Sequence, residues 1–217
     1  MTWRGRAAAL LAPLCALACG SNAPDVPEEL LGGSSSCSAP GYPNSGTGTE
    51  KGDVVVNACF TGYRAPDRVS PTPEHRETIS FSDYYDPAGT KGVSLLLINT
   101  AAFWCGACLA EHETLPDHAR ELAPQGLVVI SAVFQDAHRD AATLEDVERW
   151  IANFHSNFPV VADPKLDLQR YSPPSMAPLN MVVDPRSMKI LREYVGDQSS
   201  VMWPYIKSEL AARSAQP

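Results

Sequence analysis

The sequence has few basic residues and no cluster of them. Its 217 residues include 17 lysines and arginines against 25 aspartates and glutamates, which gives a formal net charge of −8. Proteins that bind nucleic acids usually display a basic patch or stripe on their surface. The sequence therefore predicts no nucleic-acid partner, and an acidic surface does not by itself indicate a substrate.

The sequence also lacks an apolar run of the roughly 20 residues that a membrane-spanning helix needs. The N-terminal apolar stretch at 7–18 is shorter and follows Arg4 and Arg6, as in a secretory signal. The residues that end it, ALAC at 16–19, resemble the lipobox of bacterial lipoproteins, although leucine usually stands three positions before the cysteine. The resemblance implies a signal peptide at 1–18 and a lipid anchor on Cys19, with an ordinary cleaved signal as the alternative.

Export sets the redox compartment, because an envelope protein can keep disulfides that the cytosol would reduce. The residue after the anchor cysteine, Gly20, resembles the sorting pattern of outer-membrane lipoproteins that face the periplasm. Residues 20–52 are rich in Ser, Gly, Pro and Asn, so they bury too little apolar surface to offset the entropy lost on ordering. We therefore expect residues 19–52 to form a lipidated flexible linker.

Six cysteines are present, and two of them are accounted for at the N-terminus: Cys15 in the signal and Cys19 as the anchor. Four remain and make two pairs. Cys105 and Cys108 are three residues apart, and we expect the other two to form a structural disulfide that holds the N-terminal arm to the domain. These other two are Cys37 and Cys59.

From residue 53 onward the sequence alternates segments typical of strands and of helices. The runs at 93–98 and 126–134 are almost entirely apolar, as in strands buried on both faces. Leu109, Leu115, Ala119 and Leu122 recur at helical spacing, so we expect a helix from about residue 105 to the Pro-Gln-Gly at 124–126. Other strands are expected near 53–60 and 159–162, and a second short element at 77–85. We also expect a helix at 143–155, a hairpin from 179–184 and 188–195, and a closing helix from 199 or 200. The pattern predicts one mixed α/β domain at 53–217, with helices on both faces of its sheet.

The sequence FWCGAC at 103–108 directly follows the apolar run at 93–98. A structural zinc site usually needs four ligands, but there is no second C-x-x-C and the five histidines are scattered. His112 lies one turn past Cys108 and is taken as a solvated helix residue, so no metal site is predicted. A purely structural disulfide over so short a loop would add little stability.

A redox pair is the interpretation that fits all parts of this motif. A strand that ends near Thr100, followed by a helix from Cys105, would place that sulfur beside unpaired backbone N–H groups. The helix dipole there stabilises a thiolate and lowers the pKa of the thiol. Cys108, one turn along on the same face, can resolve a mixed disulfide. We therefore expect Cys105 to attack and Cys108 to release the product.

FWCGAC closely resembles the active site of thioredoxin-fold oxidoreductases, and residues 75–212 resemble the exported TlpA/ResA type. The resemblance implies that Glu111 transfers protons beneath the cysteine pair, where Asn99 replaces the buried aspartate of thioredoxin. It also implies that Pro178 is cis and faces the cysteines. A cis bond would leave Ala177 free to pair with an extended substrate, and Trp104 would shield the cysteines and contact that substrate.

The sequence also departs from the family pattern. The proline five residues after the second cysteine is replaced by Glu113, although Pro116 follows, and Gly106-Ala107 stands where thioredoxin has Gly-Pro. The helix at 143–155 and the strand at 159–162 correspond to the central insertion of TlpA/ResA-type proteins. The expected fold is therefore thioredoxin-like, with an N-terminal strand extension and this helix–strand insertion.

The resemblance predicts a membrane-tethered thiol–disulfide oxidoreductase that needs no cofactor. Its partners would be a disulfide-bearing protein or small thiol and a membrane electron donor or acceptor. A thiol peroxidase is an alternative, but the P-x-x-x-T-x-x-C pattern of such enzymes is missing before Cys105. A non-enzymatic thioredoxin-fold lipoprotein is the other alternative, and the intact C-x-x-C motif argues against it.

Overall fold

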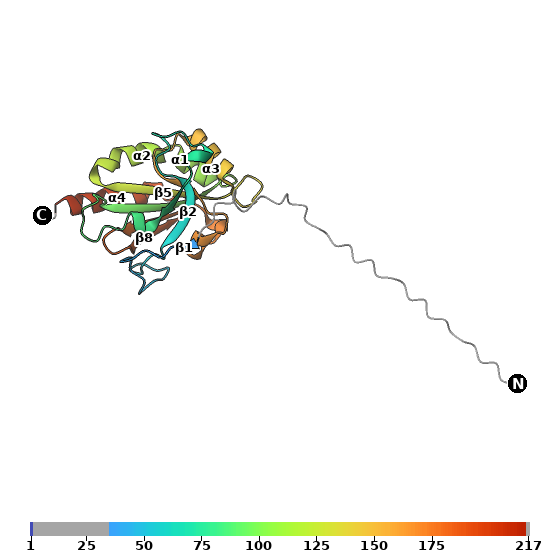
Figure 1. Cartoon of the computed structure of the whole chain (residues 1–217), viewed down its shortest axis with the longest axis horizontal. Helices are drawn as coiled ribbons and strands as arrows, with labels where there is room; N and C mark the ends of the chain where they lie inside the picture. Colours follow the sequence, from blue (N-terminus) through green and yellow to red (C-terminus); the bar gives the residue numbers. More distant parts are fainter. Residues whose placement is uncertain (2–34, 216–217) are drawn as a thin grey trace.

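The computed structural model describes Met1 and residues 35–215 of the chain (Figure 1). The expected signal peptide, the anchor cysteine Cys19 and the linker up to residue 34 lie outside the described residues. No helix in the described part of the chain is both long enough and apolar enough to cross a membrane.

One mixed sheet forms the centre of the domain. β4 lies in its middle, parallel to β5 on one side and antiparallel to β7 on the other. The strands follow the order β1-β2-β6-β5-β4-β7-β8, with β3 paired to β2. All eight residues of β4 are buried, as the unbroken apolar run predicts. The strands are β1 (Ser35–Ser36), β2 (Ala58–Tyr63), β3 (Glu77–Ser80), β4 (Leu95–Ala102), β5 (Leu127–Gln135), β6 (Val160–Ala162), β7 (Leu179–Asp184) and β8 (Lys189–Val195).

The two faces of this sheet are covered differently. In Figure 1, α1, α2 and α3 lie along one side of the sheet, and the blue N-terminal segment lies on the other. All four α-helices contribute to one core cluster, including α4 through Met202 and Ile206. The opposite cluster is closed by Tyr42 and Val55 of the N-terminal segment and by single 3-10 turns. The helices on the first face are therefore α-helices, and those on the second face are short 3-10 helices. The α-helices are α1 (Gly106–His112), α2 (Leu115–Leu122), α3 (Leu144–Phe154) and α4 (Ser199–Ser214), and the 3-10 helices are η2 (Pro73–His75), η3 (Phe81–Asp83), η4 (Ala123–Gln125), η5 (Asp167–Arg170) and η6 (Pro174–Met176).

The single helix expected from residue 105 to about 123 is two helices in the structure. α1 ends at His112 and α2 begins at Leu115. Pro116 explains the break, because a proline ring clashes with the carbonyl group four residues earlier and removes one backbone hydrogen bond. That carbonyl belongs to His112, the last residue of α1. The proline is instead accommodated in the first turn of α2.

The insertion holds the N-terminal strands to the rest of the sheet. β6 pairs with β5 in parallel and with β2 antiparallel, so among the described strands β2 joins the central ones only through β6. α3 begins as its sequence predicts, because the Thr143 side chain accepts a hydrogen bond from the Asp146 amide and the Asp146 carboxylate accepts one from the Thr143 amide.

The folded unit begins earlier than residue 53. Tyr42 is buried, and its hydroxyl donates to the Val55 carbonyl at 2.8 Å. The segment 46–54 is fixed by backbone bonds such as Val54 N–H to the Gly46 carbonyl, 2.8 Å, and Gly52 N–H to the Ile190 carbonyl, 2.8 Å. The part of the expected linker from Cys37 onward is therefore packed on the domain, because these tertiary contacts offset the flexibility that its composition predicts.

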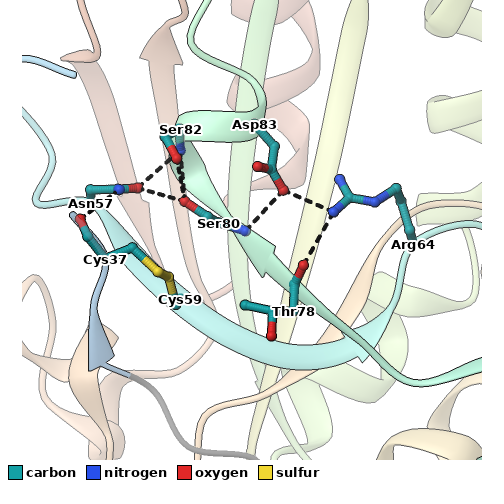
Figure 2. Close-up of a disulfide and its surroundings, with 8 residues drawn as sticks. All are labelled: Cys37, Asn57, Cys59, Arg64, Thr78, Ser80, Ser82 and Asp83. Carbon is teal, nitrogen blue, oxygen red and sulfur yellow. Dashed lines mark hydrogen bonds and ion pairs between the residues drawn. A yellow bond between two sulfur atoms is a disulfide. The ribbon is translucent and has the colours of Figure 1, made fainter. Parts of the chain in front are cut away.

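A disulfide between Cys37 and Cys59 fastens this segment to β2, with the two Cα atoms 5.7 Å apart. Figure 2 shows Asn57 beside the disulfide, where its amide donates to the Cys37 carbonyl at 2.9 Å. The amide oxygen of Asn57 accepts from the Ser80 hydroxyl and the Ser82 amide, both at 2.9 Å. The disulfide and Asn57 together tie the N-terminal segment to β2 and to the start of η3.

Candidate active site

The cysteine pair lies where β4 gives way to α1. Cys105 is the N-cap residue of α1, with extended backbone angles, and its sulfur accepts a hydrogen bond from the Cys108 amide at 3.1 Å. The two cysteines form a disulfide with Cα atoms 5.2 Å apart. Cys105 is 4% exposed and Cys108 is fully buried, which is the order that attack by the first sulfur requires.

Trp104 directly precedes Cys105 and packs against the core cluster that contains both cysteines. Its indole N–H donates to the Gln135 side chain at 3.0 Å, and the guanidinium carbon of Arg139 lies 3.9 Å from the centre of its ring system. A cation over an aromatic face at this distance is an attractive contact. The indole is therefore held from the end of β5 and from the loop that follows it. The positive charge of the Arg139 guanidinium lies over one of its faces.

The peptide bond between Ala177 and Pro178 is cis, as the motif predicts. Ala177 is half-buried, has extended backbone angles, and packs against the core cluster that contains both cysteines. Two hydrogen bonds hold this loop in place. The Gly196 amide donates to the Pro178 carbonyl at 2.8 Å, and the Leu179 amide donates to the Thr100 hydroxyl at 3.1 Å.

Glu111 lies one turn past Cys108 on α1 and is only 6% exposed. Its two carboxyl oxygens each receive one amide hydrogen, Oε1 from Asn180 at 2.6 Å and Oε2 from Asn99 at 2.9 Å. Burial raises the pKa of this carboxyl to about 7, against the lowering effect of the two amides, and the negative charge of Asp197 raises it further. A buried acid that titrates near neutral pH can both take up and release a proton at the working pH.

Three polar residues form a row across the sheet beneath α1. Asn99 on β4 is the direct neighbour of Ser131 on β5 and of Asn180 on β7. All three are buried, and Asn99 bonds to both neighbours, accepting from the Ser131 hydroxyl at 2.8 Å and donating to the Asn180 amide oxygen at 2.9 Å. Sequence reasoning found Asn99 but missed Ser131 and Asn180. The available signal was a buried polar residue inside each of three largely apolar strands: Asn99 in β4, Ser131 in β5 and Asn180 in β7.

The prediction that His112 is solvated was wrong. His112 is fully buried, with Trp150 and Phe154 packed against its ring at centroid distances of 4.9 Å and 5.5 Å. The reason lies in the orientation of α1, which turns this position toward the sheet and α3. Burial lowers the pKa of His112 to about 4, although the hydrogen bond with the Cys108 carbonyl raises it. Among the described residues, no group of three His, Cys, Asp or Glu side chains is placed to hold a metal ion.

This arrangement is suited to thiol–disulfide exchange. A thiolate at Cys105 would keep the Cys108 amide hydrogen bond, and a bond to an ionised acceptor is stronger than one to a neutral acceptor. Cys108 is bonded to the same sulfur, and the buried carboxyl of Glu111 lies one turn further along α1. Each of these functions comes from a side chain or the backbone of the chain itself.

Comparison with known proteins gives the same assignment. The profile of the AhpC/TSA family matches residues 61–186, which is more than half of the chain. A thiol:disulfide interchange protein, DsbE, from Vibrio cholerae is 34% identical over 159 residues, which cover 71% of this chain and 73% of that protein.

Solved structures share the fold at lower identity. A thiol:disulfide interchange protein DsbE from Chlorobium tepidum, described as putative, superimposes with a TM-score of 0.55 at 19% identity, covering 76% of this chain and 99% of that one. A thiol:disulfide interchange protein from Bacteroides sp. gives 0.54 at 16% identity, covering 75% and 91%. The C-x-x-C geometry, the family profile and the curated relative agree, and the chain belongs to the AhpC/TSA family as a thioredoxin-fold thiol–disulfide oxidoreductase.

Proposed function

We propose that Cys105 is the nucleophile and Cys108 the resolving cysteine of this oxidoreductase. The observation that carries the assignment is the hydrogen bond from the Cys108 amide to the Cys105 sulfur, together with the complete burial of Cys108. In the reducing direction, the Cys105 thiolate attacks one sulfur of a substrate disulfide and expels the other as a thiolate. Cys108 then attacks the Cys105 sulfur, releases the second substrate thiolate, and closes the Cys105–Cys108 disulfide. Two electrons pass to the substrate. The proton lost by Cys108 and one proton taken from solvent end on the two substrate sulfurs, because the Cys105 thiolate has no proton to give.

Glu111 is proposed to carry the proton of the resolving step. Cys108 must lose its proton before it attacks, and it is buried away from water. Glu111 lies one turn along the same helix, and its pKa of about 7 leaves a large fraction ionised at neutral pH. The carboxylate therefore accepts the Cys108 proton, and in the opposite direction the carboxylic acid returns it.

Substrate is proposed to bind between Trp104 and the cis-proline loop. Ala177 has φ −63° and ψ 152°, so its backbone is extended and suited to pairing with a substrate strand. Trp104 offers an aromatic face backed by Arg139. The proposed substrate class is a protein or small molecule that carries a disulfide, because the relatives are thiol:disulfide interchange proteins.

The cellular setting is a proposal from the sequence. A signal at 1–18 and lipidation of Cys19 would hold the domain at the outer membrane, facing the periplasm, with residues 20–34 as the tether. A membrane-bound donor or acceptor would then exchange electrons with the Cys105–Cys108 pair. The anchor is tested by metabolic labelling with a palmitate analogue, with Cys19→Ala as the control. A label that persists in the variant contradicts the proposal.

The activity is tested by trapping. The Cys108→Ser variant should accumulate a mixed disulfide between Cys105 and a model disulfide substrate such as insulin, seen by mass under non-reducing conditions. The Cys105→Ser variant should accumulate none, and a Cys37→Ser/Cys59→Ser protein should behave like the wild type. Equal trapping by both single variants would contradict the assignment. Faster consumption of hydrogen peroxide than of disulfide would instead favour the thiol peroxidase alternative.

A further inference from the structure

His112 is connected to Glu111 by hydrogen bonds as well as by the helix that carries both. The Nε2 atom of His112 lies 3.0 Å from the Ser131 hydroxyl, which lies 2.8 Å from the Asn99 amide oxygen. The amide nitrogen of Asn99 then donates to Glu111 at 2.9 Å. The chain of contacts is continuous, and each of its members is buried.

The hydrogen-bonded path from His112 to Glu111 has one hydrogen too few, because two acceptors compete for the same hydroxyl hydrogen. The Cys108 carbonyl can only accept, so the His112 Nδ1 atom, 3.0 Å away, must carry the ring hydrogen. A neutral ring then has a bare Nε2, which can only accept. Ser131 has one hydroxyl hydrogen, and two acceptors lie within reach of it, Nε2 of His112 and Oδ1 of Asn99. Only one of them can receive it at a time.

We propose that His112 is a positioning residue that tunes the proton affinity of Glu111 by competing with Asn99 for the hydroxyl hydrogen of Ser131. When that hydrogen points to Asn99, it polarises the amide and strengthens the N–H bond to the Glu111 carboxylate. When it points to His112, the amide is a weaker donor and the protonated carboxyl is favoured. The Ser131 hydroxyl is thus a two-position element that follows the charge of Glu111. This inference deepens the proposed function, because it rests on Glu111 as the proton carrier.

The surroundings hold the His112 ring in place and leave Nε2 directed at Ser131. Its ring is fixed by three aromatic side chains, Trp150, Phe154 and Phe158, and its contact with Cys108 is to the carbonyl. Burial keeps the ring neutral above about pH 4.

Few charged or titratable groups bear on Glu111. The one charge among the described residues that raises its pKa is that of Asp197, in the loop between β8 and α4. His112 and Cys108 share the helix with Glu111 and Cys105 lies at its start, but the two cysteines are joined as a disulfide. The three facing strands contribute neutral groups, the side chains of Asn99, Ser131 and Asn180.

Two substitutions in the full chain separate the alternatives. In His112→Phe the Ser131 hydrogen is committed to Asn99, so the pKa of Glu111 should fall. In Ser131→Ala the amide loses its donor, so the pKa should rise, and each shift should be about threefold to tenfold in proton affinity, the worth of one hydrogen bond. The double variant should match Ser131→Ala, because without the hydroxyl His112 has no connection to Asn99. The readout is the carboxyl carbon resonance of Glu111, titrated in the oxidised protein.

Shifts in the same direction, or effects that add in the double variant, overturn the proposal. If His112→Phe does not fold, the imidazole nitrogen resonances of the wild-type protein decide, because a ring protonated on Nε2 would not compete and would overturn it. The titration does not depend on turnover. If the enzyme is active but the Glu111 pKa does not shift as expected in the variants, only this inference is contradicted. If the pKa shifts as expected but the protein cannot form a mixed disulfide, only the proposed function is contradicted.

Discussion

The side-chain nitrogen of Asn180 lies 2.6 Å from Oε1 of Glu111. Asn180 is the second residue after Pro178, and Glu111 is the third after Cys108. This bond therefore joins the cis-proline loop to the helix that carries the cysteine pair. It also makes the proton affinity of Glu111 depend on the strand that leads away from the substrate loop.

Replacing Glu111 by glutamine should slow disulfide exchange at neutral pH. The glutamine would keep the shape of the side chain but could not accept the Cys108 proton, and a positioned general base typically contributes at least about 100-fold. We expect a loss of that order in the resolving step, measured by stopped-flow release of thiol from a preformed mixed disulfide. Glu113→Gln, an exposed glutamate two residues away, is the matched control. Equal rates for both variants would exclude Glu111 as the proton carrier.

Replacing Asn180 by leucine should move the acidic limb of the activity profile to higher pH. The Asn180 amide stabilises the Glu111 carboxylate, so its loss raises the pKa of a carboxyl that burial has already raised to about 7. The base is then ionised only in more alkaline solution. The measurement is the rate of disulfide reduction from pH 5 to 9. An unchanged profile with a uniformly lower rate would mean that Asn180 serves only in packing.

The unfolding free energy should report the same carboxyl. The pKa of Glu111 rises from 4.5 to about 7 on folding, so between these values the folded state binds more protons and stability falls as pH rises. Glu111→Gln removes this loss, so its stability relative to the wild type should increase from pH 4.5 to pH 7, by about 1–3 kcal/mol. Urea unfolding at both pH values measures it. A difference between the two proteins that does not change with pH would contradict the shifted pKa.

His112 has the opposite linkage. Its pKa falls from 6.5 to about 4 on folding, so the unfolded state binds more protons between these values and stability rises with pH. The two contributions oppose each other from about pH 4.5 to 6.5, which makes the single substitution of Glu111 the informative one.

The elements were largely predictable from the sequence, because each carries its signal locally. The apolar run of β4 and the Thr143–Asp146 cap of α3 are examples. The polar row was not predictable, because Ser131 and Asn180 become neighbours of Asn99 only through strand register. The segment from Cys37 to residue 52 was misassigned for a related reason. Its composition is that of a linker, and only long-range contacts such as that of Tyr42 with Val55 show that it is packed.

Removing the Cys37–Cys59 disulfide should reduce stability but not activity. The cysteines are 22 residues apart, and closing a loop of that length stabilises a fold by about 3 kcal/mol. We expect a Cys37→Ser/Cys59→Ser protein to lose about that amount in urea unfolding while its thiol–disulfide exchange rate stays within about twofold of the wild type. A comparable loss of activity in the folded variant would indicate a redox role for this pair.

Cys105 should be ionised near neutral pH, because the start of α1 stabilises its thiolate, and the proposed chemistry depends on this ionisation. The most direct test is the pH dependence of iodoacetamide alkylation of Cys105 in the reduced Cys108→Ser protein, in which the residue 108 amide remains. We predict a pKa for this thiol clearly below the value of about 8.5 for free cysteine. A pKa at or above that of free cysteine would contradict the prediction.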